Sequence, residues 1–321
     1  MGERTLYTFR FRAMGGPGQL QFTSEQGLSA AEALAREAID EVLRLERKYS
    51  RFLPSSRLSL INRHAGRMPV AVDEETVELV QQALWLARVT GGAFDPTMGV
   101  LHRAWDFRRG RVPSLDELSR LRPLVGHEAV SVKDGTVFLR REGMELDLGG
   151  VGKEYAVDRA AALLAQGGVD AAIVNLAGDL RTVGSRGDGH PWRIGVADPR
   201  AQRRCRFAVR LLGGGGVATS GDYERYFVKD GVRYHHLLDA RTGYPSRGLA
   251  SATVVAPTAS RAGLLATAAF LLGPRAGREL VEATAGCEAA LIGEDGQLYA
   301  TPGMDRLSDL PGSLYARLPG L

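Results

Sequence analysis

The distribution of apolar and polar positions along the chain predicts both strands and helices. Two alternating segments at residues 5–12 and 19–23, separated by a glycine-rich turn, predict a pair of strands. From Ser29 to Tyr49, apolar side chains recur at helical spacing, and Glu32 is placed to complete a capping box with Ser29. The chain is therefore expected to open with two strands and a long amphipathic helix.

The remaining patterns switch between the two element types. Helices are predicted at residues 74–90, from Ser114, at 154–166 and around 264–271. Strands are predicted at residues 129–132, 136–140, 145–148, 171–176, 192–196, 207–212, 223–229 and 252–256. This order lacks the strict strand–helix–strand rhythm of a doubly wound sheet, so it predicts an α+β fold. We expect one domain over residues 1–321, with two fused lobes divided near residues 110–145 as the alternative.

The composition is that of an ordinary globular protein. The chain has 321 residues, of which 44% are hydrophobic and 24% charged, and no apolar run reaches the length of a membrane span. The first residues lack the apolar core of a secretory signal. Cys205 and Cys287 lie far apart, so no disulfide framework is indicated. We therefore expect a reduced, cytoplasmic protein with no membrane partner.

The charge balance is mildly basic, with a net charge of +4. The densest arginine cluster covers residues 200–210. It lacks the regular interleaving of aromatic residues with which proteins stack the bases of single strands. We interpret the cluster as a solvated edge strand and expect no nucleic-acid partner.

A glycine-rich loop followed by a lysine and a predicted helix is the first candidate for chemistry. It does not fit a P-loop, because Asp147 and Glu154 stand where that motif needs glycine and a hydroxyl. It does not fit the dinucleotide fingerprint either, because Tyr155 falls on the third glycine. Small residues before a helix N-terminus can still cradle a pyrophosphate. A tight strand-to-helix turn without a ligand is the alternative.

Two further segments carry candidate functional groups. In residues 91–97, Ala93 and Phe94 could frame a flat aromatic ligand, although such a segment alone is more often a helix-ending loop with Asp95 as a capping residue. Adjacent histidines at His235 and His236 point to opposite sides of a strand, so they are poor ligands for one metal ion. One of them suits a general base near an acid. An ordinary hairpin with a solvent-facing histidine is the alternative.

Taken together, seven segments in order resemble the ApbE family, the FAD:protein FMN transferases. Near the start "MGG" begins at Met14, "SSRLSLIN" covers residues 55–62, and "GAFDPT" covers residues 92–97 with "WDF" downstream. "DLGGVGKEYAVD" begins at Asp147, and "SGDYER" begins at Ser220. The last is "HHLLDARTG", residues 235–243. The resemblance spans about residues 14–272 and implies an ApbE-like fold with mixed or antiparallel sheets packed against helices.

The resemblance implies an activity. Family members bind FAD and Mg²⁺, cleave the FAD pyrophosphate and pass the FMN half to a threonine hydroxyl in a small-residue motif of a partner flavoprotein, with AMP leaving. Some members instead hydrolyse FAD to FMN and AMP. Such displacement at phosphorus needs charge neutralisation, in-line positioning and a base for the attacking hydroxyl. An FAD-binding carrier without catalysis is a third possibility, from another functional class.

The family's functional residues can be carried over position by position. The residues implied to contact the flavin or adenosine parts of FAD are Met14, Phe52, Ala93, Phe94, Asp95, Asp147, Ser220 and Leu238. Lys153 is implied to meet phosphate or ribose. The carbonyl of Gly150 and the hydroxyl of Thr267 are implied to ligate Mg²⁺. His236, with His235 as the alternative, is the candidate base, and Asp239 completes the catalytic pair.

Five positions depart from the family pattern. They are Gly16 in place of Thr, Arg57 in place of an acidic residue, Glu154 in place of Gly, Ala240 in place of Pro, and Gly263 in place of Asp. Gly263 and Thr267 share one face of the predicted last helix. We expect Gly263 to leave a gap where a carboxylate ligand belongs. On this expectation Gly263→Asp tightens Mg²⁺ binding, and the missing carboxylate favours the carrier.

Overall fold

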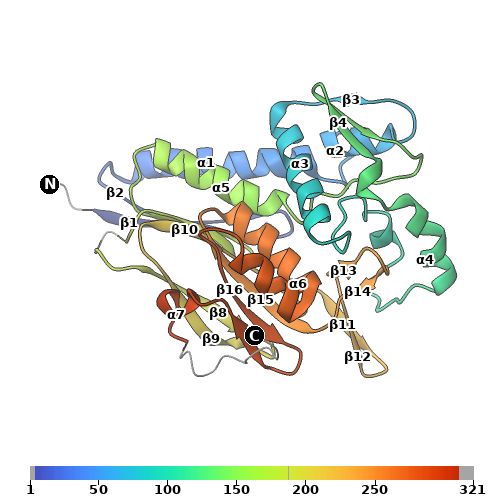
Figure 1. The fold of residues 1–321 in the computed structure, drawn as a ribbon. Coiled ribbons are helices and arrows are strands. Elements are labelled where there is room, and N and C mark those ends of the chain that lie inside the picture. Colours follow the sequence, from blue (N-terminus) through green and yellow to red (C-terminus); the bar gives the residue numbers. More distant parts are fainter. Residues whose placement is uncertain (1–3, 187, 311–321) are drawn as a thin grey trace.

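The chain folds around one large antiparallel sheet, which confirms the α+β expectation (Figure 1). The computed structural model describes residues 4–310 except residue 187. Its sheet order is β1-β2-β6-β7-β10-β15-β16-β17, and every neighbouring pair is antiparallel. The strands are β1 (Thr5–Ala13), β2 (Gly16–Ser24), β6 (Ala172–Leu176), β7 (Asp179–Val183), β10 (Gly214–Gly221), β15 (Leu249–Ala256), β16 (Glu288–Gly293) and β17 (Leu298–Ala300).

Both faces of this sheet are covered, which makes three layers. One face carries the helices α1 (Leu28–Tyr49), α5 (Gly152–Gln166) and α6 (Ala259–Glu282). The other face packs against β8 (Trp192–Asp198), β9 (Ala201–Leu211) and α7 (Met304–Leu307). Neighbouring positions of a strand serve opposite layers: Ala218 packs on the helix side and Val217 on the other. As a result every residue of β15 is buried.

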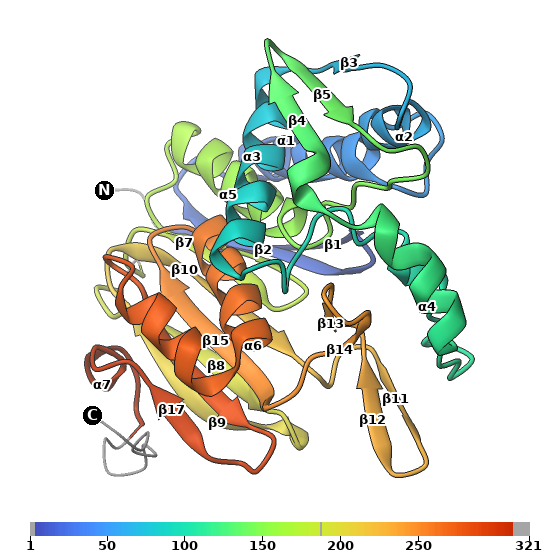
Figure 2. The same cartoon turned by 45° about the vertical axis from the view of Figure 1, so that its right-hand side comes forward.

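A second group of elements sits beside the helix layer. It comprises α2 (Arg57–Arg63), α3 (Glu74–Val89), α4 (Leu115–Leu121) and a three-stranded sheet of β3 (Val70–Ala71), β5 (Thr136–Leu139) and β4 (Val130–Lys133). Two hairpins follow β10, made of β11 (Tyr226–Lys229) with β12 (Val232–His235) and of β13 (Leu238–Asp239) with β14 (Tyr244–Pro245). Figure 2 shows β11–β12 reaching away from the main sheet.

Several sequence-based boundaries need correction. Helix α1 begins at Leu28 with Gly27 as its N-cap residue, so Ser29 lies inside the helix and the capping box of Ser29 and Glu32 does not form. Residues 145–148 form a single bridge, Met98 with Glu145, rather than a strand. The strand expected at 223–229 begins only at Tyr226. The elements that had no counterpart in the sequence-based prediction include α2, β7, β10, β16, β17 and α7.

Three general expectations can be compared with the structure. Both cysteines are free thiols. The arginine-rich stretch lies on β9, which pairs with β8. Over residues 4–310, leaving aside residue 187, the structure contains no helix that is long and apolar enough to cross a membrane.

Candidate active site

The glycine-rich loop leads directly into α5, and its first residue is an anchored carboxylate. Asp147 lies 3.2 Å from Nδ1 of His102 and 3.5 Å from Nε of Arg51, and it accepts a hydrogen bond from the Gly149 N–H at 2.8 Å. Burial raises the pKa of Asp147, but the His102 hydrogen bond and the charges of His102 and Arg51 outweigh it and lower the pKa to about 2. Asp147 is therefore anionic at neutral pH.

The same loop lies against the ring of Phe94. A Cβ at Gly150 would stand 2.8 Å from Cε2 of Phe94, so a residue with a side chain could not keep this contact. The ring is buried, as are Ala93 and Asp95 on either side of it. Glycine at position 150 thus brings the backbone close to Phe94 immediately before α5 begins, and no side chain caps that helix end.

Three charged groups meet at the first turn of α5. Lys153 forms an ion pair with Asp179, at the start of β7, and its Nζ lies 3.8 Å from Oε1 of Glu154. Asp179 also accepts a hydrogen bond from the Thr219 N–H at 3.1 Å. Burial lowers the pKa of Lys153, but the two carboxylates raise it above its ordinary value. Burial raises the pKa of Glu154 well above its ordinary value, despite the Lys153 charge.

Sequence reasoning missed Asp179. It follows a turn in which Ala177 and Gly178 both have positive φ, and its side chain is almost completely buried. The available signal was an acidic residue three positions after the end of a predicted strand, at residues 171–176. No spacing rule links that position to Lys153, because the two meet only through the packing of α5 on the sheet.

The gap expected at Gly263 does not exist, because the side chain of Glu154 fills it. A Cβ at Gly263 would lie 2.4 Å from Cγ, 2.7 Å from Cδ and 3.1 Å from Oε1 of Glu154. Gly263 and Glu154, two of the departures from the family pattern, are therefore in direct contact. The prediction that an aspartate at 263 would simply fill empty space is wrong, and so is the idea that this region lacks a carboxylate.

Two hydroxyl groups lie close to one another on α6 and β10. Ser220 Oγ and Thr267 Oγ1 are 3.2 Å apart. Thr267 is one helical turn after Gly263 and so shares its face of α6. The carboxylate of Glu154, which lies over Gly263, and these hydroxyls therefore occur on neighbouring parts of one surface between α5, α6 and β10.

The adjacent histidines have different surroundings. His235 is buried with its ring edge-on to Phe270 of α6, and its Nε2 lies 3.0 Å from the Ser246 carbonyl oxygen. His236 is half-buried, and its Nδ1 has no hydrogen-bond partner in the described part of the chain. Burial, with the charges of Arg225, His235 and His102, lowers the pKa of His236 to about 3. His236 thus lies within electrostatic range of His102, the residue that contacts Asp147.

Asp239 is the last residue of β13, directly before the turn to β14. Both of its carboxylate oxygens accept hydrogen bonds from the Arg241 side chain, at 2.6–3.2 Å. The next residue, Ala240, donates its N–H to the Ala93 carbonyl at 2.9 Å, a bond that proline could not make. Leu238, the other residue of β13, is buried. These contacts join the turn to the Phe94 loop.

Two other predicted FAD contacts are Met14 and Phe52. Met14 occupies the β1–β2 turn with a φ of 51°, and its N–H donates to Glu46 Oε1 at 2.5 Å. A Cβ at Gly16 would stand 2.6 Å from Cβ of Ala177, which explains why threonine is absent from that position. Phe52 is 80% exposed, with the guanidinium of Arg51 4.9 Å from its ring centre.

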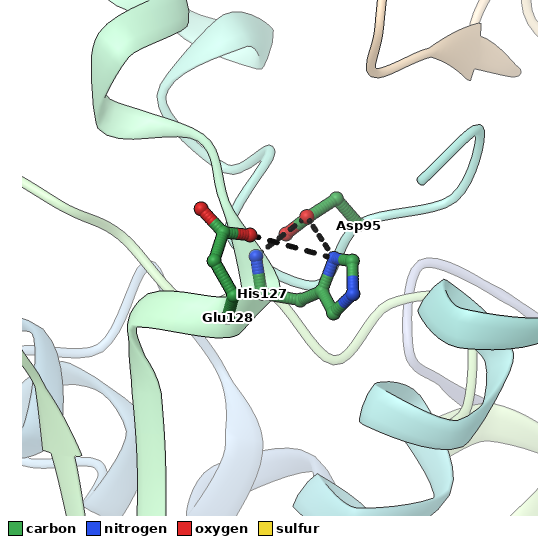
Figure 3. A group of neighbouring side chains, drawn as sticks. All are labelled: Asp95, His127 and Glu128. Carbon is green, nitrogen blue, oxygen red and sulfur yellow. Dashed lines mark hydrogen bonds and ion pairs between the residues drawn. The ribbon is translucent and has the colours of Figure 1, made fainter. Parts of the chain in front are cut away.

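Asp95 belongs to a group of side chains that could in principle hold a metal ion, with His127 and Glu128 (Figure 3). One oxygen of Asp95 accepts hydrogen bonds from the N–H and hydroxyl of Thr97, and the other lies 2.7 Å from the His127 N–H and 2.9 Å from its Nδ1. Glu128 is largely exposed. The geometry is that of a carboxylate that holds two loops together.

The chain is similar in sequence and in structure to known proteins. The model of the ApbE family matches residues 8–291. An FAD:protein FMN transferase of Treponema pallidum is 34% identical, with 86% of this chain and 82% of that protein covered. One from Vibrio cholerae is 32% identical, with 84% and 82% covered. Among solved structures, the ApbE protein of Thermotoga maritima has a TM-score of 0.86 and 35% identity, covering 94% of this chain and 99% of the other.

Proposed function

The chain belongs to the ApbE family, and from that premise we propose that it is an FAD:protein FMN transferase. It transfers FMN from FAD to a threonine hydroxyl of a partner flavoprotein and releases AMP, with Mg²⁺ bound. The observation that carries the proposal is the meeting of Lys153, Glu154 and Asp179 at the uncapped N-terminus of α5, beside the Ser220–Thr267 hydroxyls. The named relatives supply the reaction class.

The N-terminus of α5 and Lys153 are suited to a pyrophosphate. Free N–H groups at a helix start, with the positive end of its dipole, attract phosphate oxygens, and Lys153 adds a full charge. Asp147 is anionic and suited to accept hydrogen bonds from a hydroxyl or ring N–H of the ligand. The further proposed FAD contacts are Met14, Phe52, Ala93, Phe94, Asp95, Ser220 and Leu238.

The donor set at this place fits Mg²⁺. Hard divalent cations prefer oxygen ligands, and the groups here are hydroxyl, carbonyl and carboxylate oxygens, one of them a buried carboxylate oxygen without a partner. We propose the hydroxyl of Thr267 and the carbonyl of Gly150 as ligands. When bound, the ion supplies charge neutralisation for the pyrophosphate.

His236 is the proposed base. Its pKa of about 3 keeps the ring neutral at physiological pH, and because the ring is then a weak base, it takes the proton only as the attacking oxygen bonds to phosphorus. As the threonine oxygen bonds to the phosphorus on the FMN side, its proton passes to His236, and the bond from that phosphorus to the bridging oxygen breaks. AMP leaves with that electron pair. His235 is the weaker candidate because its Nε2 already contacts a carbonyl oxygen. Asp239, engaged by Arg241, would shape the turn beside the base.

The carrier alternative rested on the missing carboxylate at position 263. Since Glu154 brings a carboxylate to that space, this ground is removed. Hydrolysis of FAD to FMN and AMP uses the same groups with water as the attacking nucleophile, so the two enzyme activities are separated by experiment.

The test is to incubate the protein with FAD, Mg²⁺ and candidate acceptor flavoproteins, and to quantify AMP, free FMN and protein-bound flavin. Equal amounts of AMP and bound flavin support transfer. AMP with free FMN alone indicates a pyrophosphatase, and unchanged FAD indicates a carrier. The cytoplasmic location and the division of the chain near residues 110–145 stay predictions.

A further inference from the structure

Glu154 is placed in an unusual way for a charged side chain. It is only 7% exposed, although it lies in the first turn of α5. Its side chain points at α6, where Gly263 has no side chain and therefore leaves it room. The position is sterically defined, because any Cβ at 263 would collide with Cγ and Cδ of Glu154.

One oxygen of this carboxylate lacks a hydrogen-bond donor among the described residues. Oε1 lies 3.8 Å from Lys153 Nζ, which is an ion pair without a close hydrogen bond. Oε2 is buried and accepts no hydrogen bond from the described residues, and its neighbour Asp179 can hydrogen-bond to Glu154 only if the two acidic groups share a proton. Lys153 is already engaged more closely by Asp179. Burying a carboxylate oxygen with no partner is costly, so its presence indicates a ligand that the protein chain alone does not supply.

The surroundings of that oxygen are suited to a small hard cation. Thr267 lies one turn beyond Gly263 on the same face of α6, and its hydroxyl is 3.2 Å from the hydroxyl of Ser220. Asp179 adds a second buried carboxylate beside Glu154. When both carboxyl groups are ionised, Lys153 balances only one of the two negative charges, and a bound divalent cation balances the other.

We propose that Glu154 supplies the carboxylate ligand of the divalent-cation site, reaching from α5 across Gly263 to join Thr267 of α6. The inference rests on the proposed function for the presence of the cation. It places the carboxylate ligand on α5, whereas the sequence pattern indicated position 263 on α6. Gly263 leaves the space that the Glu154 side chain occupies.

The test is Mn²⁺ binding by the full-length, chelator-stripped protein, measured from the electron paramagnetic resonance signal of free Mn²⁺ with and without FAD. Glu154→Gln keeps the shape and removes the charge, and we expect it to weaken Mn²⁺ binding by about tenfold or more. Glu142→Gln, at an exposed glutamate paired with Arg67, is the control and should bind as wild type does.

A second variant moves the carboxylate between helices. Since the Cβ of residue 263 would point at the carboxyl group of Glu154, the double variant Glu154→Ala/Gly263→Asp places a carboxylate in the same space from α6. We expect it to recover most of the Mn²⁺ affinity that Glu154→Ala alone loses. Gly263→Asp alone should not tighten binding, because the two side chains collide.

A structural role gives a different pattern. If Glu154 only balances Lys153, Glu154→Gln lowers the melting temperature in EDTA and leaves Mn²⁺ affinity unchanged, and the inference is overturned. Wild-type Mn²⁺ binding with normal FMN transfer, both unaffected by Glu154→Gln, refutes this inference and spares the proposed function. Mn²⁺ binding that depends on Glu154, without any FMN transfer, supports this inference and contradicts the proposed function.

Discussion

Replacing Gly263 with alanine should destabilise the protein even though it improves the helix. Inside a helix, glycine to alanine ordinarily stabilises by roughly 1 kcal/mol. Here the new Cβ would stand 2.4 Å from Cγ and 2.7 Å from Cδ of Glu154, far inside normal carbon contact. Overpacking costs about 1–3 kcal/mol, so the net expectation is a loss of about 1 kcal/mol.

The sign should reverse when Glu154 is shortened. In a Glu154→Ala background nothing remains for the new Cβ to strike, and Gly263→Ala should then stabilise by up to ~1 kcal/mol, giving a coupling of about 2 kcal/mol between the sites. The measurement is the free energy of unfolding in urea with EDTA present, for the two single variants and the double variant. Gly152→Ala is the matched control, since a Cβ there meets nothing within 4 Å. A stabilising Gly263→Ala in the presence of Glu154 would refute the packing described here.

Three other variants test separate parts of the site. The Asp158 carboxylate accepts hydrogen bonds from the Ala259 and Ser260 N–H groups at 2.8 Å, so Asp158→Ala should lower the free energy of unfolding in urea by about 1–3 kcal/mol. His236→Ala should slow FMN transfer by roughly 10²-fold while FAD affinity in a fluorescence titration stays the same, and lost FAD binding would assign it to structure instead. The pKa of Asp147, about 2 against 3.8, means that the unfolded state binds more protons between these values. Stability from Asp147 is therefore present above pH ~4 and lost as the pH falls toward ~2, on the order of 2 kcal/mol, and Asp147→Asn should flatten acid unfolding curves in that window.

The parts of the fold that sequence reasoning reached are those with a strong local pattern. The helix after the glycine-rich loop was predicted at residues 154–166 and is observed at Gly152–Gln166, because its apolar spacing is set by burial against the sheet. Strand β10 was missed because its glycines are typical of a loop. Glycine is required at 216 by tertiary packing, since a Cβ there would lie 2.3 Å from the Ala259 nitrogen.

Some residues of the candidate site were found from sequence motifs, and others only from the structure. The motif positions carried over from the family resemblance include residues that the structure brings near the start of α5, such as Lys153, Ser220 and Thr267. Asp179 and the contact between Glu154 and Gly263 lay beyond a motif-based analysis, because each depends on which side chains meet after α5 and α6 pack on the sheet. In the sequence, Glu154 and Gly263 look like two separate departures from the family pattern. In the structure, the two residues are in direct contact.

The most direct test of the central claim is the intact mass of an acceptor flavoprotein after incubation with the protein, FAD and Mg²⁺. The account predicts a gain of one FMN group on a threonine, one AMP released for each FMN attached, and no gain when that threonine is replaced by alanine. AMP production with free FMN, while the masses of all tested acceptors stay unchanged, would contradict it.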